Sequence, residues 1–333
     1  MKKLLTIMTL LLTLCLTCAF AEDTPTSYTS GDYEYILLAD GTAQITDYTG
    51  RDKKVTVPAT LGGHTVTAIG DSAFDWCWTL TGITIPDSVT AIGDGAFYGC
   101  TSLTGITIPD SVTSIGTNPF AFCTVLTDIQ VSLNHPTLAT IDGVLFEKAT
   151  KKLICYPCAF TEKSYAIPRG IRVIGDSAFS GCDALTSITI PDSVTTIGGY
   201  AFYDCESLSG ITIPDNVTTI GEGAFYSCKS LTSITLPDSL STIGGYAFCY
   251  CESLSGITLP DNVTTIGDWA FSYCKSLTSI TIPDSVTTIG GWVFDGCTAL
   301  KTVTVTRDSF AEQYCIDNGL SYVYTDTYDW LLD

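Results

Sequence analysis

The chain has 333 residues, of which 45% are hydrophobic, so it holds enough apolar material for a core and cannot be disordered throughout. Lysine and arginine number 15 against 35 aspartates and glutamates, which gives a net charge of -20 at pH 7. A chain this acidic repels polyanions, so no nucleic acid partner is expected.

Residues 1–21 have the features of a secretory signal peptide. Two lysines precede an apolar run over residues 4–16, and Ala19-Phe20-Ala21 has the small-x-small pattern that signal peptidase cleaves. The run is too short to span a bilayer. We therefore expect cleavage after Ala21 and a secreted or cell-surface protein. Lipid attachment at Cys18 is the alternative, although the residues before it match a lipobox poorly.

The first structured segment that the sequence predicts is an N-terminal cap over residues 22–60. Apolar and polar residues alternate from Tyr33 to Ala59 on either side of Asp40-Gly41, a dipeptide typical of hairpin turns. A β-hairpin in this position would cover the apolar face of the first unit of the repeat that follows.

A repeat organises residues 61–302. The motif Ile-Gly-x-x-Ala-Phe-x-x-Cys occurs nine times, with the alanine replaced by Pro119 in one copy and by Val293 in another. The copies begin at Ile69, Ile92, Ile115, Ile174, Ile197, Ile220, Ile243, Ile266 and Ile289. Every step is 23 residues except that from Ile115 to Ile174, which is 59. A fixed period in the twenties predicts a solenoid rather than separate globular domains.

One unit, Thr186 to Leu208, illustrates the predicted coil. Ile188 and Ile190 alternate with polar residues as in a short strand, a proline ends that strand, and a second extended run follows. The glycine column that includes Gly198 indicates a corner whose backbone conformation excludes a Cβ atom. Residues 200–205 then predict a turn of α- or 3-10-helix.

Stacked coils would bury side chains that one unit cannot bury alone, and equivalent residues would form ladders at a strand spacing of about 4.8 Å. The phenylalanine ladder contains Phe74, Phe97, Phe120, Phe179, Phe202, Phe225, Phe248, Phe271 and Phe294. The cysteine ladder contains Cys77, Cys100, Cys123, Cys182, Cys205, Cys228, Cys251, Cys274 and Cys297.

The full unit, Leu-x-x-Ile-Thr-Ile-Pro-Asp-Ser-Val-Thr-Thr-Ile-Gly-x-x-Ala-Phe-x-x-Cys, resembles the BspA-type leucine-rich repeats of bacterial surface and secreted proteins. The resemblance covers nearly the whole chain after residue 21. It implies a leucine-rich-repeat solenoid of parallel short strands with short helical or 3-10 turns. About nine regular coils of 23 residues and one irregular coil would be capped at both ends.

The long step in the repeat contains an irregular coil and an insertion over residues 124–168. Residues 141–157 hold two apolar runs around a lysine-rich turn and predict a protruding hairpin. Lys148, Lys151 and Lys152 lie in this hairpin and give an acidic chain one basic patch. The patch is either a solvated turn or a binding epitope.

The last segment, residues 303–333, is predicted to be a C-terminal cap and tail. Residues 309–318 have the pattern of a helix that Gly319 ends. Packed on the last coil, this helix would cover its apolar face.

Thirteen cysteines follow residue 21, and their pattern allows more than one chemistry. The ladder cysteines should all point into the core with parallel Cα–Cβ directions, which oppose disulfide formation. We therefore expect buried free thiols and an oxygen-poor environment. Cys155 and Cys158 have CxxC spacing and are expected to be a structural pair. A thiol redox site or a metal site is the alternative, without the helix N-terminus or second ligand pair that such sites use.

Two polar columns run along the predicted coils. The aspartate column contains Asp87, Asp110, Asp192, Asp215, Asp238, Asp261 and Asp284. The threonine column contains Thr84, Thr107, Thr189, Thr212, Thr235, Thr258 and Thr281. Calcium could relieve repulsion among the aspartates, but one carboxylate per coil gives too few ligands, so we expect no metal and no cofactor. The threonines are expected to stabilise the sheet, with an ice-binding or carbohydrate face as the alternative.

Aromatic residues concentrate in the turns of the last five repeats. Those before the ladder phenylalanines are Tyr200, Tyr246, Trp269 and Trp292, and those after them are Tyr203, Tyr226, Tyr250 and Tyr273. Exposed aromatic rings in a row bind sugars and form protein hot spots. These residues are the main binding candidates, and ordinary packing at the rim of the coils is the alternative.

Catalytic motifs are lacking in the sequence. His64 and His135 are the only histidines, and neither lies beside a serine or cysteine in a nucleophile motif. The family resemblance implies a non-enzymatic protein that binds host or microbial proteins or glycans through variable positions on a rigid surface. A self-associating spacer or envelope component is the alternative, and a thiol redox protein using Cys155 and Cys158 is the third.

Overall fold

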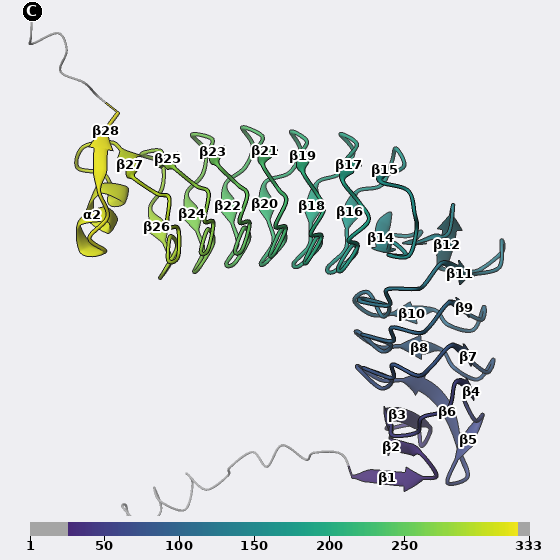
Figure 1. Ribbon diagram of the computed structural model, residues 1–333. Coiled ribbons are helices and arrows are strands. Elements are labelled where there is room, and N and C mark those ends of the chain that lie inside the picture. Colours follow the sequence, from purple (N-terminus) through teal and green to yellow (C-terminus); the bar gives the residue numbers. More distant parts are fainter. Residues whose placement is uncertain (1–25, 326–333) are drawn as a thin grey trace, which may run out of the picture.

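The computed structural model describes residues 26–325 and shows a β-solenoid bent into an L (Figure 1). Coils of about 23 residues stack along each arm, and the prediction of a leucine-rich-repeat solenoid is confirmed. The expected signal peptide, the alternative lipid site at Cys18 and residues 326–333 of the expected tail lie outside the described residues. Within residues 26–325 no helix has both the length and the apolar character needed to span a membrane.

An antiparallel meander covers the first coil. Its strands are β1 (Ser27–Ser30), β2 (Tyr33–Leu37) and β3 (Ala43–Tyr48). The Asp40 carboxylate accepts hydrogen bonds from both the backbone and the hydroxyl of Thr42 and so fixes the turn between β2 and β3. The Tyr48 ring stacks on Phe74 of the first coil with 5.1 Å between centroids, which closes the apolar end of the solenoid.

Each regular coil contributes one short strand to each of two columns. The first column contains β4 (Lys54–Thr56), β7 (Gly82–Thr84), β9 (Gly105–Thr107), β11 (Asp128–Gln130), β15 (Ser164–Ala166), β17 (Ser187–Thr189), β19 (Gly210–Thr212), β21 (Ser233–Thr235), β23 (Gly256–Thr258), β25 (Ser279–Thr281) and β27 (Thr302–Val305). The second column contains β6 (His64–Ile69), β8 (Ala91–Ile92), β10 (Ser114–Ile115), β14 (Lys152–Cys155), β16 (Val173–Ile174), β18 (Thr196–Ile197), β20 (Thr219–Ile220), β22 (Thr242–Ile243), β24 (Thr265–Ile266) and β26 (Thr288–Ile289). A short strand, β5 (Thr60–Leu61), pairs antiparallel with β6.

The ends of the strands follow from the sequence. Strands pair in parallel with equivalent residues side by side, as Ile211 does with Ile234. The proline that follows the first-column strand of each regular coil cannot donate to the ladder, and its carbonyl instead closes a turn. In one coil, Val194 N donates to the Pro191 carbonyl at 3.0 Å. This turn leads the chain into the second column.

The segment after each second-column strand forms successive hydrogen-bonded turns instead of a short helix. Tyr203 N donates to the Tyr200 carbonyl at 2.9 Å, and Cys205 N donates to the Phe202 carbonyl at 3.2 Å. Tyr200 (φ 54°) and Asp204 (φ 58°) have left-handed backbone conformations. Because a right-handed helix cannot contain such residues, the chain turns sharply here and bonds to the next coil.

The glycine column that includes Gly198 is needed because the backbones of neighbouring coils approach closely there. The expectation that these glycines adopt a backbone conformation closed to other residues is therefore corrected. Gly198 is not among the residues with positive φ. A Cβ atom on Gly198 would lie 2.6 Å from the backbone nitrogen of Asp176 in the preceding coil, and one on Gly244 would lie 2.7 Å from that of Glu222. Only a hydrogen atom fits between coils at this spacing.

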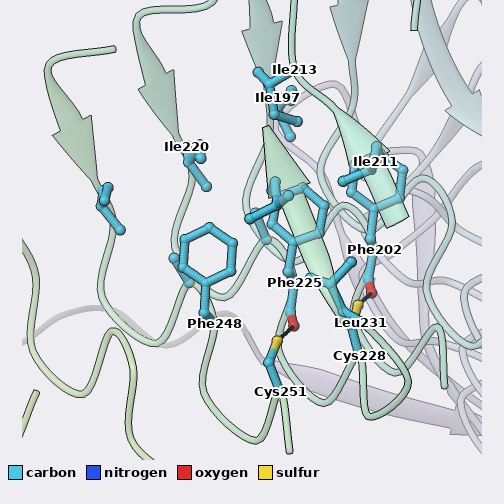
Figure 2. Packing of buried hydrophobic residues seen from close by; sticks show 14 of the residues in the cluster. Ile197, Phe202, Ile211, Ile213, Ile220, Phe225, Cys228, Leu231, Phe248 and Cys251 are labelled. Carbon is cyan, nitrogen blue, oxygen red and sulfur yellow. Dashed lines mark hydrogen bonds between the residues drawn. The ribbon is translucent and has the colours of Figure 1, made fainter. Parts of the chain in front are cut away.

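The structure places the ladder phenylalanines in the core. Phe202, Phe225 and Phe248 are fully buried, and their successive ring centroids are 5.1 and 5.4 Å apart (Figure 2). The ladder members Phe74, Phe97, Phe120, Phe179, Phe271 and Phe294 are also buried. Cys228 Sγ donates to the Phe202 carbonyl at 3.2 Å, and Cys251 Sγ donates to the Phe225 carbonyl at 3.1 Å. Rings and weak S–H···O bonds thus join neighbouring coils.

The hairpin of the insertion lies between the cores of the two arms and packs against both. This corrects the prediction that it protrudes. Its strands β12 (Leu138–Ile141), β13 (Val144–Glu147) and β14 pair antiparallel in that order. Leu145 and Ile154 pack into the core of the N-terminal arm, whereas Phe146 and Leu153 pack into the core of the C-terminal arm. Alternate side chains of a strand point to opposite faces, so one hairpin completes two cores.

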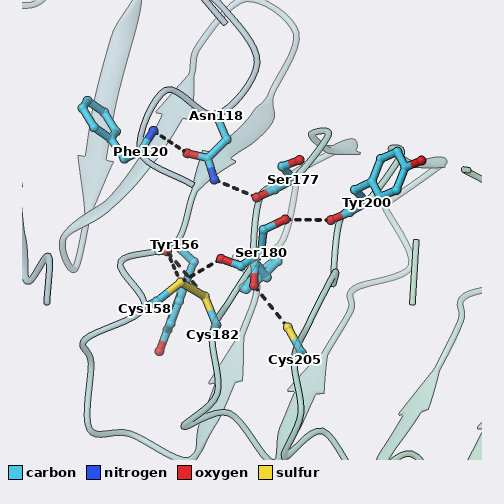
Figure 3. Close-up of a disulfide and its surroundings, with 10 residues drawn as sticks. Asn118, Phe120, Tyr156, Cys158, Ser177, Ser180, Cys182, Tyr200 and Cys205 are labelled. Carbon is cyan, nitrogen blue, oxygen red and sulfur yellow. Dashed lines mark hydrogen bonds between the residues drawn. A yellow bond between two sulfur atoms is a disulfide. The ribbon is translucent and has the colours of Figure 1, made fainter. Parts of the chain in front are cut away.

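The strand columns are interrupted at the bend. β10 and β11 end the sheets of the N-terminal arm, and the sheets of the C-terminal arm begin at β12 and β15 (Figure 1). The turns on the inner side remain in contact across this break. Asn118 Nδ2 donates to the Ser177 carbonyl at 2.7 Å, while Asn118 Oδ1 accepts from Phe120 N at 3.1 Å (Figure 3). The buried Asn118 amide therefore connects the two arms.

The C-terminal end is covered by α2 (Phe310–Asp317) and β28 (Tyr322–Tyr324), which pairs in parallel with β27. Ser309 Oγ caps the helix by accepting from Glu312 N at 3.2 Å. Ala311 and Cys315 are buried against the last coil. These contacts leave the core closed at this end as well.

Candidate functional site

The aromatic candidates lie on the turns that follow the second strand column, and these turns face the inside of the L (Figure 1). We call Tyr200, Tyr246, Trp269 and Trp292 the first aromatic row. Trp269 stacks between Tyr246, at 6.2 Å between centroids, and Trp292, at 5.1 Å. The Tyr200 ring instead lies over Gly223, where a Cβ atom would meet the ring at 2.3 Å.

A second aromatic row follows the ladder phenylalanines and is longer than the sequence indicated. It comprises Trp76, Tyr98, Phe122, Tyr203, Tyr226, Tyr250 and Tyr273, with 4.6–5.6 Å between successive centroids. The sequence prediction covers only the last five repeats, whereas Trp76, Tyr98 and Phe122 lie in the first three. Their motif positions could have revealed them, but the contact of Phe122 with Tyr203 across the bend has no signal in the sequence.

The backbone at these positions does not favour large side chains. Tyr200, Tyr246, Trp269 and Trp292 have φ between 53° and 58°, a region that costs a residue with a Cβ about 1–2 kcal/mol. The equivalent residues in other coils are small, among them Ser72, Gly95, Ser177 and Gly223. The fold therefore does not require aromatic rings in the first row.

Two tyrosine hydroxyls, one in each row, have a raised pKa and remain neutral donors near neutral pH. Burial and then the adjacent Glu222 raise the pKa of Tyr200 to about 12, and the Tyr200 hydroxyl donates to Glu222 Oε1 at 2.8 Å. Burial is also the main reason that the pKa of Tyr226 is raised to about 12. The rows thus combine apolar rings with hydrogen-bond donors.

Stacking limits which parts of the rings a ligand can reach. Rings that pack face to face, as Trp269 does on Trp292 and Tyr250 on Tyr273, cover one another's faces. Phe122 and Tyr203 instead meet edge to face. Trp76 and Trp292, each at one end of a row, are more open, with 57% and 63% of their surface exposed to solvent. Each of these two indoles therefore has surface that a ligand can reach.

The basic candidates lie apart from the aromatic rows. Lys148 and Lys151 are exposed in the turn between β13 and β14, and Lys152 is half-buried on β14. Lys148 Nζ donates to the carbonyl of His135 at 2.5 Å, which closes the insertion on itself. No hydrogen bond or ring contact within residues 26–325 joins these lysines to the aromatic rows, so the structure does not combine them into one site.

The cysteines correct two predictions. Cys158 forms a disulfide with the ladder residue Cys182 rather than pairing with Cys155, so Cys182 is not a free thiol (Figure 3). Cys155 is buried and unpaired, and burial raises the pKa of its thiol. The bridge joins cysteines 24 residues apart, one more than the regular step of 23, where the irregular coil departs from the regular spacing. The other ladder cysteines, Cys205 and Cys228 included, are free thiols.

Both histidines have structural contacts. His64 Nδ1 lies 2.8 Å from the Gly41 carbonyl. His135 is buried, with Nε2 at 3.2 Å from the Pro109 carbonyl and Nδ1 accepting from Leu138 N at 3.1 Å. Within the described part of the chain, no three histidine, cysteine or carboxylate side chains are placed to hold a metal ion.

The polar columns lie on the surface of the coils. In the aspartate column, Asp110 accepts a hydrogen bond from Ser132 Oγ at 2.7 Å. The threonine column is exposed on the first strand column, where Thr212 is paired with Thr235 and Thr258 with Thr281. The arrangement suits solvated turns and a regular sheet face.

The fold and its ladders define a leucine-rich-repeat protein. The BspA-type leucine-rich repeat region, in six copies, matches residues 53–163, 154–255 and 219–319. The chain therefore belongs to the BspA-type leucine-rich repeat family, which confirms the resemblance found in the sequence. Membership points to a repeat-based protein with a binding or surface role.

Solved structures agree with this family. A leucine-rich cell surface protein from Faecalibacterium prausnitzii is 29% identical with a TM-score of 0.55, over 92% of this chain and 100% of that one. A leucine-rich repeat protein from Eubacterium ventriosum is 27% identical with a TM-score of 0.55, over 83% of this chain and 95% of that one. The pneumococcal vaccine antigen PcpA, at 19% identity and a TM-score of 0.50 over 91% and 99%, shares the fold. Among curated proteins, none matches the chain.

Proposed function

We propose that this is a secreted or cell-surface, non-enzymatic adhesion protein that binds an extracellular protein or glycan through the inner turn face of the L. The observation that carries the proposal is the pair of aromatic rows on that face. Their rings do not fill the core, and the first row occupies strained positions where other coils hold glycine or serine. Aromatic residues retained at a cost to stability fit a binding surface.

Other features support a binding role. The coils are held rigidly by ladders, so the rings are fixed in position and lose little entropy when a ligand binds. The thiol redox alternative loses its basis because Cys155 is buried and Cys158 is bonded to Cys182. The relative from Faecalibacterium prausnitzii is named as a cell surface protein.

The test is a variant in which Tyr246, Trp269 and Trp292 are replaced by alanine. Binding to arrays of immobilised glycans and extracellular matrix proteins should weaken about tenfold or more, because the loss of hot-spot rings typically costs 2 kcal/mol or more. The matched control replaces Thr212, Thr235 and Thr258 on the first strand column, which should leave binding unchanged. Capture that is equal for the parent and the ring variant would refute the role of the aromatic face.

A further inference from the structure

A cleft of about 360 Å³ lies between the turn of the last coil and the C-terminal cap. The coil lines it with Trp292, Phe294 and Gly296, and the cap lines it with Tyr314, Asn318 and Leu320. The cleft lies at the C-terminal end of the first aromatic row. It therefore occupies the place where the turn of one more coil would stack if the repeat continued.

Earlier turns show what occupies the equivalent place. In the penultimate coil, alternate backbone N–H groups donate to carbonyls of the next coil. The bonds run from Trp269 N to Gly291 O at 2.9 Å, from Phe271 N to Val293 O at 3.1 Å and from Tyr273 N to Asp295 O at 2.7 Å. The same three bonds leave the preceding coil from Tyr246, Phe248 and Tyr250. Each turn thus offers three donors that a peptide segment satisfies with alternate carbonyls.

The last coil has no such partner. The backbone N–H groups of Trp292, Phe294 and Gly296 make no hydrogen bond to any group within residues 26–325. No protein group in this range accepts from these three donors, so in the free protein only water is left to accept from them. The cleft is therefore lined by three amides with unused hydrogen-bonding capacity.

The indole ring of Trp292 lies beside these donors. Trp292 is stacked on Trp269 on one side, is 63% exposed and lines the cleft. In the preceding coils, the ring in this position stacks on the aromatic side chain of the next segment, as Trp269 does on Trp292. Asp295 also lines the cleft.

We propose that this cleft binds a peptide segment of a partner protein by continuing the solenoid. Alternate carbonyls of the segment accept from the three free amides, and an aromatic side chain of the segment packs on Trp292. The carboxylate of Asp295 and the net charge of -20 favour a neutral or basic segment over an acidic one. This inference rests on the proposed binding function and specifies one class of ligand for one end of the inner face.

Amide hydrogen exchange measured by NMR tests the donors directly. In the free protein the amides of Trp292, Phe294 and Gly296 should exchange quickly, whereas those of Trp269, Phe271 and Tyr273 should be protected. The probe is a synthetic peptide with the sequence of residues 288–298 and serine in place of its cysteine. At saturation it should slow exchange of the first three amides about tenfold or more. Slow exchange in the free protein, or no protection at saturation, overturns the proposal.

Two variants locate the peptide. Trp292→Ala should weaken its binding about tenfold or more, whereas Trp78→Ala, which removes an equally exposed indole at 61%, should have no effect. Gly296→Tyr should block the cleft, because Tyr273 occupies the same position of the preceding coil with φ 56° and shows that the backbone accepts a ring. Equal affinities for the parent and both cleft variants would contradict the assignment.

A glycan or a second copy of the chain in the cleft would give different results in the amide exchange measurement. Protection of the three amides by an oligosaccharide but not by the peptide would replace a peptide partner with a glycan. Protection that rises with protein concentration alone would identify a second copy of the chain, and either result overturns the peptide assignment. Array binding that depends on Tyr246 and Trp269 but not on the cleft would leave the proposed function intact while this inference fails.

Discussion

At the scale of the residue, one thiol per coil has a defined place in the core. Cys205 Sγ donates to the Phe179 carbonyl at 3.1 Å, and Cys251 Sγ makes the equivalent bond to Phe225. Burial raises the pKa of both thiols. A thiolate could neither donate this bond nor be solvated in the core, so the folded state holds these two thiols protonated.

We expect the protein to lose stability at alkaline pH. A thiol whose pKa is raised in the folded state binds its proton more tightly there than in the unfolded chain, where its pKa is about 8.5. Its contribution is complete below that pH and is lost as the pH rises towards the folded pKa. The free energy of unfolding in urea should therefore be level to about pH 8 and then fall. Replacing Cys205 and Cys251 with alanine should reduce the slope by about 1.4 kcal/mol per pH unit for each thiol. An unchanged slope would show that the pKa values of these two thiols do not differ between the folded and the unfolded state.

At the scale of the element, the spacing of the coils depends on the glycine column. Gly244 faces the backbone of the preceding coil with no room for a methyl group, whereas Gly256 on strand β23 has no atom within 4 Å of an added Cβ. The two glycines are only half a coil apart. They nevertheless have opposite tolerance for a side chain, because one lies between backbones and the other on an open strand face.

Substitution of these two glycines should separate the two environments. Gly244→Ala should lower the free energy of unfolding by about 1–3 kcal/mol, because the added methyl group overpacks the contact between coils. Gly256→Ala should be neutral or slightly stabilising, since alanine reduces the entropy of the unfolded chain without a clash. Urea unfolding followed by circular dichroism measures both. Equal losses in the two variants would contradict the close-approach explanation.

At the scale of the whole molecule, the two arms have separate cores that share one hairpin. Leu145 belongs to the N-terminal core and its neighbour Phe146 to the C-terminal core. The disulfide between Cys158 and Cys182 ties the irregular coil to the first regular coil of the C-terminal arm. The angle between the arms places the turns of both on the inside of the L (Figure 1).

Alanine substitutions at adjacent positions of the hairpin should therefore weaken different arms. Leu145→Ala should cost about 2–5 kcal/mol and Phe146→Ala about 3–5 kcal/mol through the cavities they leave. Hydrogen exchange followed by mass spectrometry should show faster exchange in residues 66–129 for the first variant and in residues 167–303 for the second. Identical exchange maps would mean that the arms unfold as one unit.

Part of the candidate site followed from the sequence and part did not. The positions of Tyr246, Trp269 and Trp292 in equivalent turns indicated that they form a row, because equivalent positions in a solenoid lie one above another. The left-handed backbone at these positions and the free amide of Gly296 had no signal in the motif. The left-handed backbone depends on how a turn bonds to the next coil. The free amide depends on the cap, which follows the last coil in place of another turn.

The sequence by itself determined the coil: the period, the strands that end at proline, and the phenylalanine and cysteine ladders. It could do so because each unit repeats the same local pattern and contacts chiefly its neighbours. The tertiary structure alone decided the bend, the bridge from Cys158 to Cys182, the contact of Asn118 with Ser177 and the open cleft beside Trp292. These features arise where the period is broken or ends, and there the pairing of distant residues depends on three-dimensional packing that no repeat specifies.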